Sequence, residues 1–203
     1  MGGLSEPGVG IVTGPASGDG GIVTVVGNPR AGSRTLTAAV ALAGALQQTL
    51  AARAGAGEPL APGPVFDLAE LAPGLLAPWS LSTAAAQAAA AVRSARLVVL
   101  ATPTYKGSYS GILKLLLDVI PAGGLDGVVV QPLTVAGGAE HRTLADAALR
   151  PVLAELGASV PVPALLLQES DLPAVERVAA EHAARHSAVL SAVIGALAGP
   201  PLR

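Results

Sequence analysis

The feature that most constrains the fold is a regular alternation of short apolar runs with longer helical patterns. The runs are continuous and rich in β-branched residues, which is typical of buried strands; they cover residues 21–26, 64–68, 97–101, 128–136 and 160–167. The helical patterns cover residues 34–53, 82–94, 112–120, 139–156 and 172–197. Strands that are apolar throughout indicate burial on both faces of a sheet. The order therefore predicts an α/β fold, a three-layer sandwich in which helices cover both faces of a five-stranded parallel sheet.

Proline and glycine mark the limits of this pattern. Pro132 lies inside the fourth run, which is predicted to be a strand even though proline lacks the N–H that a ladder needs. Residues 1–20 hold seven glycines and two prolines with no helical or strand periodicity. Such a segment buries too little apolar surface to offset the entropy lost on ordering. We therefore expect a flexible glycine-rich tail over residues 1–20 and one domain over residues 21–199.

Composition narrows the classes of function. The formal net charge is −2, so no general basic field would attract nucleic acid or an anionic membrane. The uncharged segments 35–52 and 71–92 are either alanine-rich or interrupted by proline and serine, which does not predict a membrane-spanning helix. The absence of cysteine excludes disulfides and thiolate chemistry and fits a cytoplasmic protein. His182 and His186 have the spacing of metal ligands but no third ligand, so we expect a solvated helix surface and no metal site.

The polar loop GNPRAGSRT, residues 27–35, connects the first strand to the first helix. Unpaired amides at a helix N-terminus carry partial positive charge and suit a phosphate dianion. Arg30 and Arg34 can add charge-assisted hydrogen bonds, while Ser33 and Thr35 can add hydroxyls. The residues alone leave it equally open that Ser33 only caps the helix and that both arginines are solvated. The triphosphatase motif G-x-x-x-x-G-K-[ST] and the dinucleotide motif G-x-G-x-x-G are both absent.

A family resemblance follows from this loop and from a second one. Gly27, Arg30, Ser33 and Thr35 at these spacings resemble the phosphate loop of the NADPH-dependent FMN reductases, which have a flavodoxin-like fold. The stretch PTYKGSYSG at residues 103–111 is similar to the sulfonate-associated FMN reductases of that family. Later motifs keep the same order, namely LKxxLDxxP at 113–121, QPL at 131–133, GG with a histidine at 137–141, and LRPVL at 149–153. The resemblance covers roughly residues 21–170.

The resemblance implies an FMN site across the loops that follow the first, third and fourth strands. Tyr105 offers a flat face and a hydroxyl near the ring, and the backbone amides around Thr104, Tyr105 and Ser108 are expected to bind the pyrimidine edge. Lys106 and His141 are candidates for contact with the flavin or the nicotinamide, although each also suits an ordinary surface position. The complete predicted set of cofactor-binding residues is Arg30, Ser33, Arg34, Thr35, Pro103, Thr104, Tyr105, Lys106, Ser108, Gly137, Gly138 and His141.

The implied activity is reduction of FMN by NAD(P)H. Because the flavin itself accepts the hydride, no catalytic acid, base or nucleophile is expected from the protein, which positions the two rings. The resemblance further implies release of reduced FMN to a flavin-dependent monooxygenase. It also implies a homodimer or homotetramer with the helix near Ser110 at a subunit contact, where Leu115, Leu116 and Val119 are expected to form an exposed apolar face.

Two alternatives remain open at this point. One is a reductase of the same fold that keeps FMN bound and reduces quinones, azo dyes or metal oxyanions. The other is a non-catalytic flavodoxin-like electron carrier, which the two arginines of the 27–35 loop disfavour because flavodoxins use a hydroxyl-rich phosphate loop.

Overall fold

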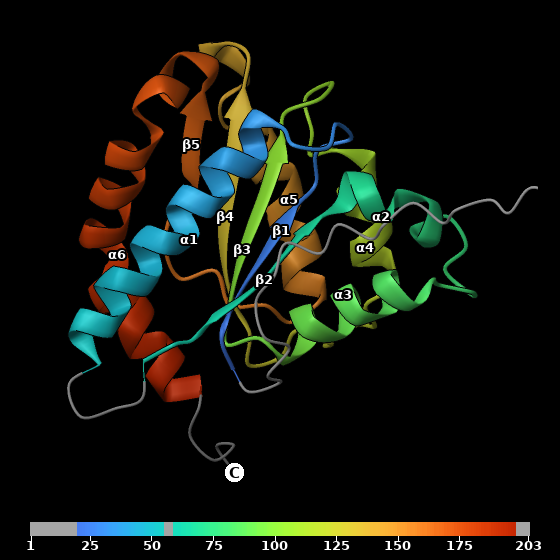
Figure 1. The fold of residues 1–203 in the computed structure, drawn as a ribbon, viewed down its shortest axis with the longest axis horizontal. Helices are drawn as coiled ribbons and strands as arrows, with labels where there is room; N and C mark the ends of the chain where they lie inside the picture. The colour runs from blue at the N-terminus through green and yellow to red at the C-terminus, as the bar shows by residue number, and fades with distance from the viewer. Residues whose placement is uncertain (1–19, 55–58, 198–203) are drawn as a thin grey trace, which may run out of the picture.

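Five parallel strands form one sheet in the computed structural model, which describes residues 20–54 and 59–197 (Figure 1). They are β1 (Ile22–Val26), β2 (Pro62–Asp67), β3 (Leu97–Pro103), β4 (Val129–Ala136) and β5 (Leu165–Gln168). Their order is β2-β1-β3-β4-β5, and every neighbouring pair is parallel. The chain thus winds outward from β1 in both directions, which opens a crevice at the carboxyl ends of β1 and β3. The predicted flexible tail lies outside the described residues, apart from Gly20.

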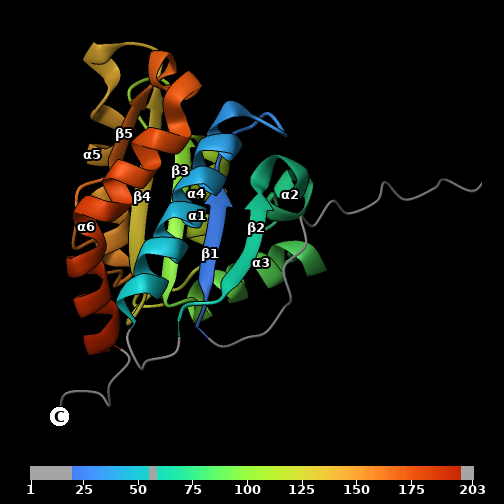
Figure 2. The same ribbon diagram turned by 60° about the vertical axis from the view of Figure 1, so that its left-hand side comes forward.

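Helices cover both faces of the sheet, as Figure 2 shows. One face carries α1 (Arg34–Arg53) and α6 (Val175–Leu197), whose buried residues share an apolar cluster with the sheet. The other face carries a second cluster and four helices, α2 (Leu68–Leu75), α3 (Thr83–Ser94), α4 (Gly111–Asp118) and α5 (Leu144–Glu155). Every residue of β1, β3 and β4 is buried. The predicted three-layer fold is therefore confirmed.

Helix α1 is long and apolar enough to span a membrane by length and composition. Its apolar face is used inside the fold, where Ala38, Leu42 and Leu46 are fully buried against the sheet. It also runs beside α6, and Arg53 Nε donates to Ser187 Oγ of that helix at 2.7 Å (Figures 1 and 2). The apolarity of α1 is explained by this packing.

Several predicted boundaries differ from the structure. Strand β5 begins at Leu165 and not at residue 160, because Pro161 and Pro163 have no N–H to donate to a ladder. Helix α6 begins at residue 175 after a short 3₁₀ helix, η2 (Glu169–Ala174), that contains a proline. Helix α5 begins at residue 144 after a second 3₁₀ turn, η1 (Ala139–His141).

Helix α2 was not predicted from the sequence. It is short, contains Pro73, and begins directly after β2, where Asp67 is its N-cap and accepts from Ala69 N–H at 3.2 Å. A proline inside so short a segment hides the helical pattern.

Pro132 lies inside β4, a strand with neighbours on both sides, and the register explains how this is possible. In a parallel strand, alternate residues direct their backbone groups to opposite neighbours. Val130 N–H donates to Ser159 O on the β5 side, so Pro132 faces the same side. Pairing with β5 begins only at Leu133, and the missing N–H therefore falls where no ladder partner exists. The predicted strand over residues 128–136 is therefore confirmed as β4, with Pro132 inside it.

Candidate active site

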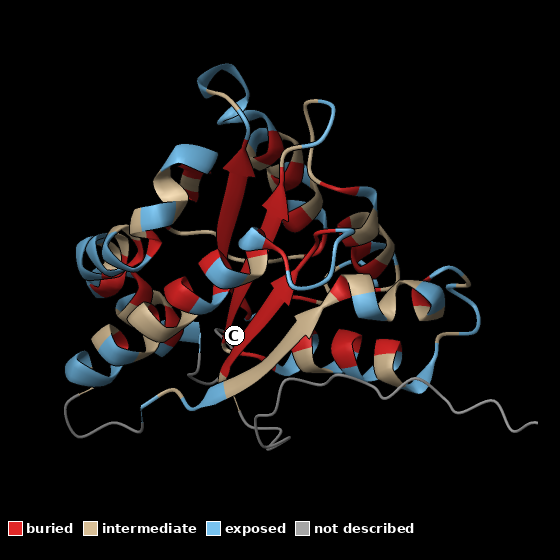
Figure 3. Ribbon diagram, turned by 45° about the horizontal axis from the view of Figure 1, so that its top comes forward, coloured by how far each residue is buried: buried red, intermediate tan, exposed pale blue. Residues whose placement is uncertain are grey.

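A cavity of about 510 Å³ opens at the carboxyl ends of β1, β3 and β4. Its walls come from the last residues of β3 and β4, from the loops that follow β1, β3 and β4, and from the residue after β5. The lining residues are Asn28, Arg30, Gly32, Ser33, Arg34, Thr35, Pro103, Thr104, Tyr105, Val135, Gly137 and Glu169. Figure 3 shows the buried strands leading to exposed loops at this end of the sheet. Ligands of doubly wound sheets bind at this position.

The 27–35 loop is held in shape by its own side chains and by Asp67. Asn28 is buried, and its side chain accepts from Arg30 N–H at 3.0 Å and donates to Thr35 Oγ1 at 3.0 Å. Gly32 has a φ of +62°, which residues with a side chain rarely adopt, and its N–H donates to Asp67 Oδ2 at 3.0 Å. The loop is therefore preorganised, which lowers the entropy lost when it binds a ligand.

Gly27 lets helix α4 approach the end of β1. A Cβ at this position would lie 2.6 Å from Leu113 Cβ and 3.2 Å from Ser110 Oγ. Ser110 caps α4 by accepting from Leu113 N–H, and its hydroxyl donates to Gly27 O. The Ser110 N–H in turn donates to Thr102 Oγ1 at 3.1 Å. These contacts join the 27–35 loop to the 103–111 loop, so the two loops that form the cavity walls are held in a fixed position relative to each other.

The 27–35 loop presents positive charge and hydrogen-bond donors to the cavity. Helix α1 begins at Arg34, and the first amides of a helix, here those of Arg34 and Thr35, have no partner within the helix. Ser33 and Thr35 are buried beside them, while Arg30 is exposed at the rim. Ser33 Oγ accepts from Leu36 N–H at 3.3 Å, which confirms the capping role and leaves the hydroxyl hydrogen free to donate.

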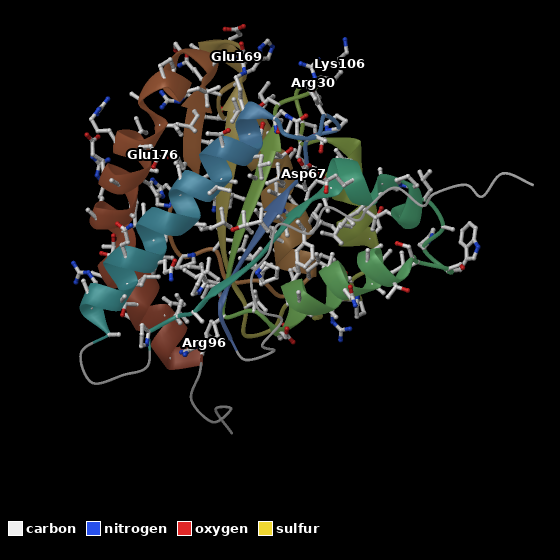
Figure 4. All side chains as sticks on the ribbon, viewed as in Figure 1. Arg30, Asp67, Arg96, Lys106, Glu169 and Glu176 are labelled. Carbon is white, nitrogen blue, oxygen red and sulfur yellow. The ribbon has the colours of Figure 1, made fainter. Side chains whose placement is uncertain are left out.

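One acidic side chain faces this positive loop. Glu169 is the first residue of η2, and its Oε1 lies 2.9 Å from Nη2 of Arg34. The start of η2 is fixed because Gln168 N–H donates to Asp171 Oδ2 at 2.8 Å. Figure 4 places Glu169 and Arg30 at the same end of the molecule. Arg34, which was predicted to bind a phosphate, contacts a carboxylate in this structure.

The 103–111 loop contains a tight turn that uses its own amides. Tyr105 and Ser108 exchange backbone hydrogen bonds of 2.8 and 2.9 Å, and Lys106 and the glycine after it have φ values of +50° and +76°. The Thr104 N–H donates to a β4 carbonyl at 2.8 Å. The amides of Thr104, Tyr105 and Ser108 are thus bonded to protein carbonyls. The expectation that the amides around these residues bind the pyrimidine edge of a flavin stays a prediction, and in this structure the three amides themselves already have protein partners.

The side chain of Thr104 offers a donor where its amide does not. Thr104 lines the cavity, and its Oγ1 is buried without a hydrogen-bond partner among the described residues. Two residues earlier, Thr102 Oγ1 accepts from Ser110 N–H and donates to Pro103 O at 3.0 Å. A buried hydroxyl without a partner is unfavourable, and in a cavity wall it indicates a ligand with a polar group.

Eight of the twelve predicted residues line the cavity, and four lie outside the cavity wall, namely Lys106, Ser108, Gly138 and His141. Lys106 stands at the exposed tip of the turn (Figure 4). His141 ends η1, with Nδ1 3.1 Å from Glu140 Oε1. A Cβ at Gly138 would meet the Glu140 carboxylate at 2.5 Å, whereas a Cβ at Gly137 would have no protein atom within 4 Å. Gly137 lines the cavity and has open space where a Cβ would stand, so a side chain would fit there without meeting protein atoms of the described residues.

Sequence reasoning missed several residues of the site. Asn28 and Asp67 shape the 27–35 loop, and Glu169 contributes the carboxylate. Asp67 and Glu169 each stand at or just after the carboxyl end of a strand, and the rule that ligands bind at these ends would have singled them out. Nothing in the pattern marks Val135, which differs from other apolar strand residues only in its position.

His182 and His186 lie on α6, and both line a second pocket of about 370 Å³ beside β5. Burial, followed by the charges of His186 and Arg185, lowers the pKa of His182 to about 4. His182 is half-buried, so the expectation that it is simply solvated is wrong. In the same pocket Arg142 donates through Nε and Nη2 to Leu166 O at 3.1 and 2.8 Å. Within the described ranges, no group of three or more metal-ligating side chains includes these histidines.

Comparison with known proteins assigns the chain to a family. The family profile described as NADPH-dependent FMN reductase matches residues 21–171, a range that contains all five strands and the whole cavity lining. The chain belongs to the NADPH-dependent FMN reductase family. It is 31% identical over 176 residues to an FMN reductase (NADPH) of Pseudomonas aeruginosa, which covers 80% of this chain and 90% of the relative. An FMN reductase (NADPH) of Escherichia coli is 49% identical over 61 residues, only 30% of this chain and 32% of that protein.

Solved structures agree with this membership. The NADH:FMN oxidoreductase EMOB superposes with a TM-score of 0.68 and 27% identity, over 89% of this chain and 91% of that one. The flavodoxin-like fold and the family predicted from the sequence are both confirmed. FMN reductases are oxidoreductases that use FMN and NAD(P)H, and the cavity of this family member contains groups that fit FMN. The helix N-terminus and the arginines suit its phosphate, and the unpaired Thr104 hydroxyl suits a polar atom of the flavin.

Proposed function

We propose that the chain is an NAD(P)H-dependent FMN reductase that binds FMN in the cavity at the carboxyl end of the sheet. The observation that carries this proposal is the combination, in one cavity, of a helix N-terminus, two arginines and a buried hydroxyl that has no partner in the described part of the chain. Residues 21–199 are proposed to act as a single FMN-binding domain. Family membership supports the same activity.

The proposed phosphate site is the 27–35 loop. The amides of Arg34 and Thr35 and the hydroxyls of Ser33 and Thr35 donate to the phosphate oxygens, while the side chains of Arg30 and Arg34 add positive charge. Because Asn28 already fixes both ends of the loop, these donors need little rearrangement when FMN enters.

The proposed ring site lies between the 103–111 loop and the end of β4. Tyr105 is half-exposed on the cavity wall and offers a flat face, and the open space beside Gly137 leaves room for a planar ring. FMN supplies the redox chemistry when bound, because its ring accepts a hydride from the nicotinamide. The protein's contribution is to hold the two rings at reacting distance and to fix their orientation.

Steady-state kinetics tests the proposal. The rate of NAD(P)H oxidation should depend on added FMN and should saturate with FMN concentration. Riboflavin has the same ring without the phosphate, so it should saturate only at a higher concentration because it loses the contacts of the 27–35 loop. FMN binding without NAD(P)H oxidation would instead identify an electron carrier, and the absence of FMN binding would refute the proposed site.

We further propose that reduced FMN leaves the cavity and is consumed by a flavin-dependent monooxygenase. The exposure of both arginines supports exchange, because solvent screens their contacts with a phosphate. The test is a coupled assay in which a flavin-dependent monooxygenase receives FMN only through this chain. FMN that stays bound through desalting, together with reduction of quinones, would favour an enzyme that retains its flavin.

Assembly as a homodimer or homotetramer in the cytoplasm is also proposed. The expected apolar face is wrong, because Leu116 is buried and Leu115 and Val119 pack against the core beneath α4. The proposal now rests on the family resemblance, and the surface to test is a groove of about 380 Å³ between α4 and α5. Its lining residues are Lys114, Leu117, Asp118, Ile120, Ala122, Pro151, Val152, Glu155 and Leu156. A monomer in light scattering at micromolar concentration would refute assembly.

A further inference from the structure

Glu169 occupies an unexpected place for a carboxylate. Among the twelve residues that line the cavity it is the only acidic one, and it stands opposite the groups that suit an anion. Its Oε1 lies 2.9 Å from Nη2 of Arg34. Arg34 is the first residue of α1, so its guanidinium and the N-terminus of the helix both bring positive charge to the same end of the cavity. A negative side chain here opposes the binding of a negative ligand.

We propose that Glu169 is an internal competitor of the FMN phosphate for Arg34, and that it keeps the affinity for FMN below what the 27–35 loop alone would give. The inference rests on the proposed function, because it assumes that FMN is the ligand of the cavity. Its consequence is an FMN that exchanges readily and is therefore used as a substrate.

The geometry makes Glu169 a competitor that can be displaced. The side chains of Arg34 and Glu169 are 65% and 52% exposed, and an ion pair with such exposure contributes little free energy. A phosphate dianion at a helix N-terminus offers Arg34 more charge and a bidentate partner. The pair also forms a wall between the cavity and a second hollow of about 270 Å³, lined by Thr37 and Leu172 among others. This hollow gives the Glu169 carboxylate space to move when a phosphate takes its place.

The backbone under Glu169 does not move with it. The hydrogen bond from Gln168 N–H to Asp171 Oδ2 closes the first turn of η2, and strand β5 immediately precedes it. The carboxylate is therefore returned to Arg34 each time the phosphate leaves. This arrangement favours release of the flavin, because the vacated guanidinium regains a partner without a change in the fold.

The substitution E169Q tests the proposal through the dissociation constant of FMN, measured by quenching of flavin fluorescence without NAD(P)H. The variant should bind FMN about two- to fivefold more tightly, which corresponds to the loss of one exposed ion pair. Its affinity for riboflavin should be unchanged, because riboflavin carries no phosphate. The matched control is E181Q, which breaks the equally exposed Arg177–Glu181 pair of 2.7 Å on α6 and alters the net charge by the same amount. That control should leave both affinities unchanged.

Repeating the substitution in an Arg34→Ala variant distinguishes competition for Arg34 from a general repulsion between the Glu169 carboxylate and the phosphate. In an Arg34→Ala chain the competition no longer exists, so adding E169Q should improve FMN affinity less than it does in the wild type. An equal gain in the two backgrounds would overturn the proposed competition. Weaker binding of both flavins by E169Q would also overturn it, because Glu169 would then bind the part that the two flavins share.

These outcomes are distinct from a failure of the proposed function. If the wild-type chain binds no FMN, the proposed function is refuted. If it binds FMN and E169Q has the same dissociation constant, only the role of Glu169 is refuted.

Discussion

Thr104 gives a test in which protein stability and ligand affinity are expected to change in opposite directions. Its Oγ1 is buried without a partner among the described residues, while Thr102 Oγ1, two residues earlier in β3, makes two hydrogen bonds. Valine keeps the shape of threonine and removes the hydroxyl. The substitutions Thr104→Val and Thr102→Val therefore form a matched pair. The first removes a hydroxyl that has no hydrogen-bond partner among the described residues, and the second removes one that makes two hydrogen bonds.

The expected magnitudes follow from this difference. A buried hydroxyl without a partner costs about 1–3 kcal/mol, so Thr104→Val should raise the free energy of unfolding of the flavin-free protein by about 1 kcal/mol. Thr102→Val leaves Ser110 N–H and Pro103 O without that partner and should lower the free energy of unfolding by about 1–3 kcal/mol. A flavin that bonds to Thr104 Oγ1 would lose one neutral hydrogen bond in Thr104→Val, and its affinity should fall about two- to tenfold.

Urea denaturation without flavin measures the first quantity, and titration of flavin fluorescence measures the second. The reasoning requires a stabilised Thr104→Val that binds FMN less well, beside a destabilised Thr102→Val. If Thr104→Val is destabilised as much as Thr102→Val, its hydroxyl has a partner within the protein. If FMN affinity is unchanged, the hydroxyl does not contact the ligand.

Three further outcomes are expected. Arg30→Ala should weaken FMN binding about tenfold, which is the low end of the range for a charge-assisted hydrogen bond because Arg30 is exposed. Calorimetric titration with FMN measures this loss, and the urea midpoint should not change. Gly137→Val should fold normally, because a Cβ there meets no protein atom within 4 Å, and should lose FMN affinity in the same titration, because the added side chain would take up space beside the proposed ring site; unchanged affinity would place the ring elsewhere. The pKa of His182 is lowered from 6.5 to about 4, mainly by burial. Below pH 6.5 the unfolded chain therefore binds a proton at this histidine more readily than the folded chain does, and the free energy of unfolding should fall as the pH drops from about 6.5 to about 4. Since His182 is only half-buried, screening limits this loss to about 1–2 kcal/mol, and urea midpoints of His182→Gln should vary less with pH over that range than those of the wild type.

The fold could be predicted from the sequence because its main signals are local and strong. A continuous apolar run such as residues 97–101 is stable in the interior of a parallel sheet, where both of its faces are buried. Once the strands were assigned, the position of the 27–35 and 103–111 loops at one edge followed from their parallel order. Failures occurred where proline changed the local outcome, as at Pro161 and Pro163 before β5 and at Pro73 in α2.

The details of the site depend on contacts that the sequence does not reveal. The amide of Tyr105 was expected to bind a ligand, but the turn closes on itself because Lys106 and its neighbouring glycine adopt positive φ values. Glu169 reaches Arg34 only because β5 ends at the same edge of the sheet as β1. Asn28 looked like an ordinary loop residue, and its role depends on the distances from one side chain to Arg30 N–H and Thr35 Oγ1. Such contacts follow from the folded geometry and have no signature of their own.

The bond from Arg142 to Leu166 has a consequence for the behaviour of the protein in concentrated solution. Strand β5 is an outer strand of the sheet. Its residue Leu166 lies opposite Thr134, whose backbone groups point toward β5, so the N–H and C=O of Leu166 point away from β4. An outer strand with free carbonyls is a template on which a strand of another molecule can add, which is a route to aggregation. The guanidinium of Arg142 occupies the Leu166 carbonyl with two donors, and the strand is only four residues long. This edge is therefore closed to strand addition by a positive charge.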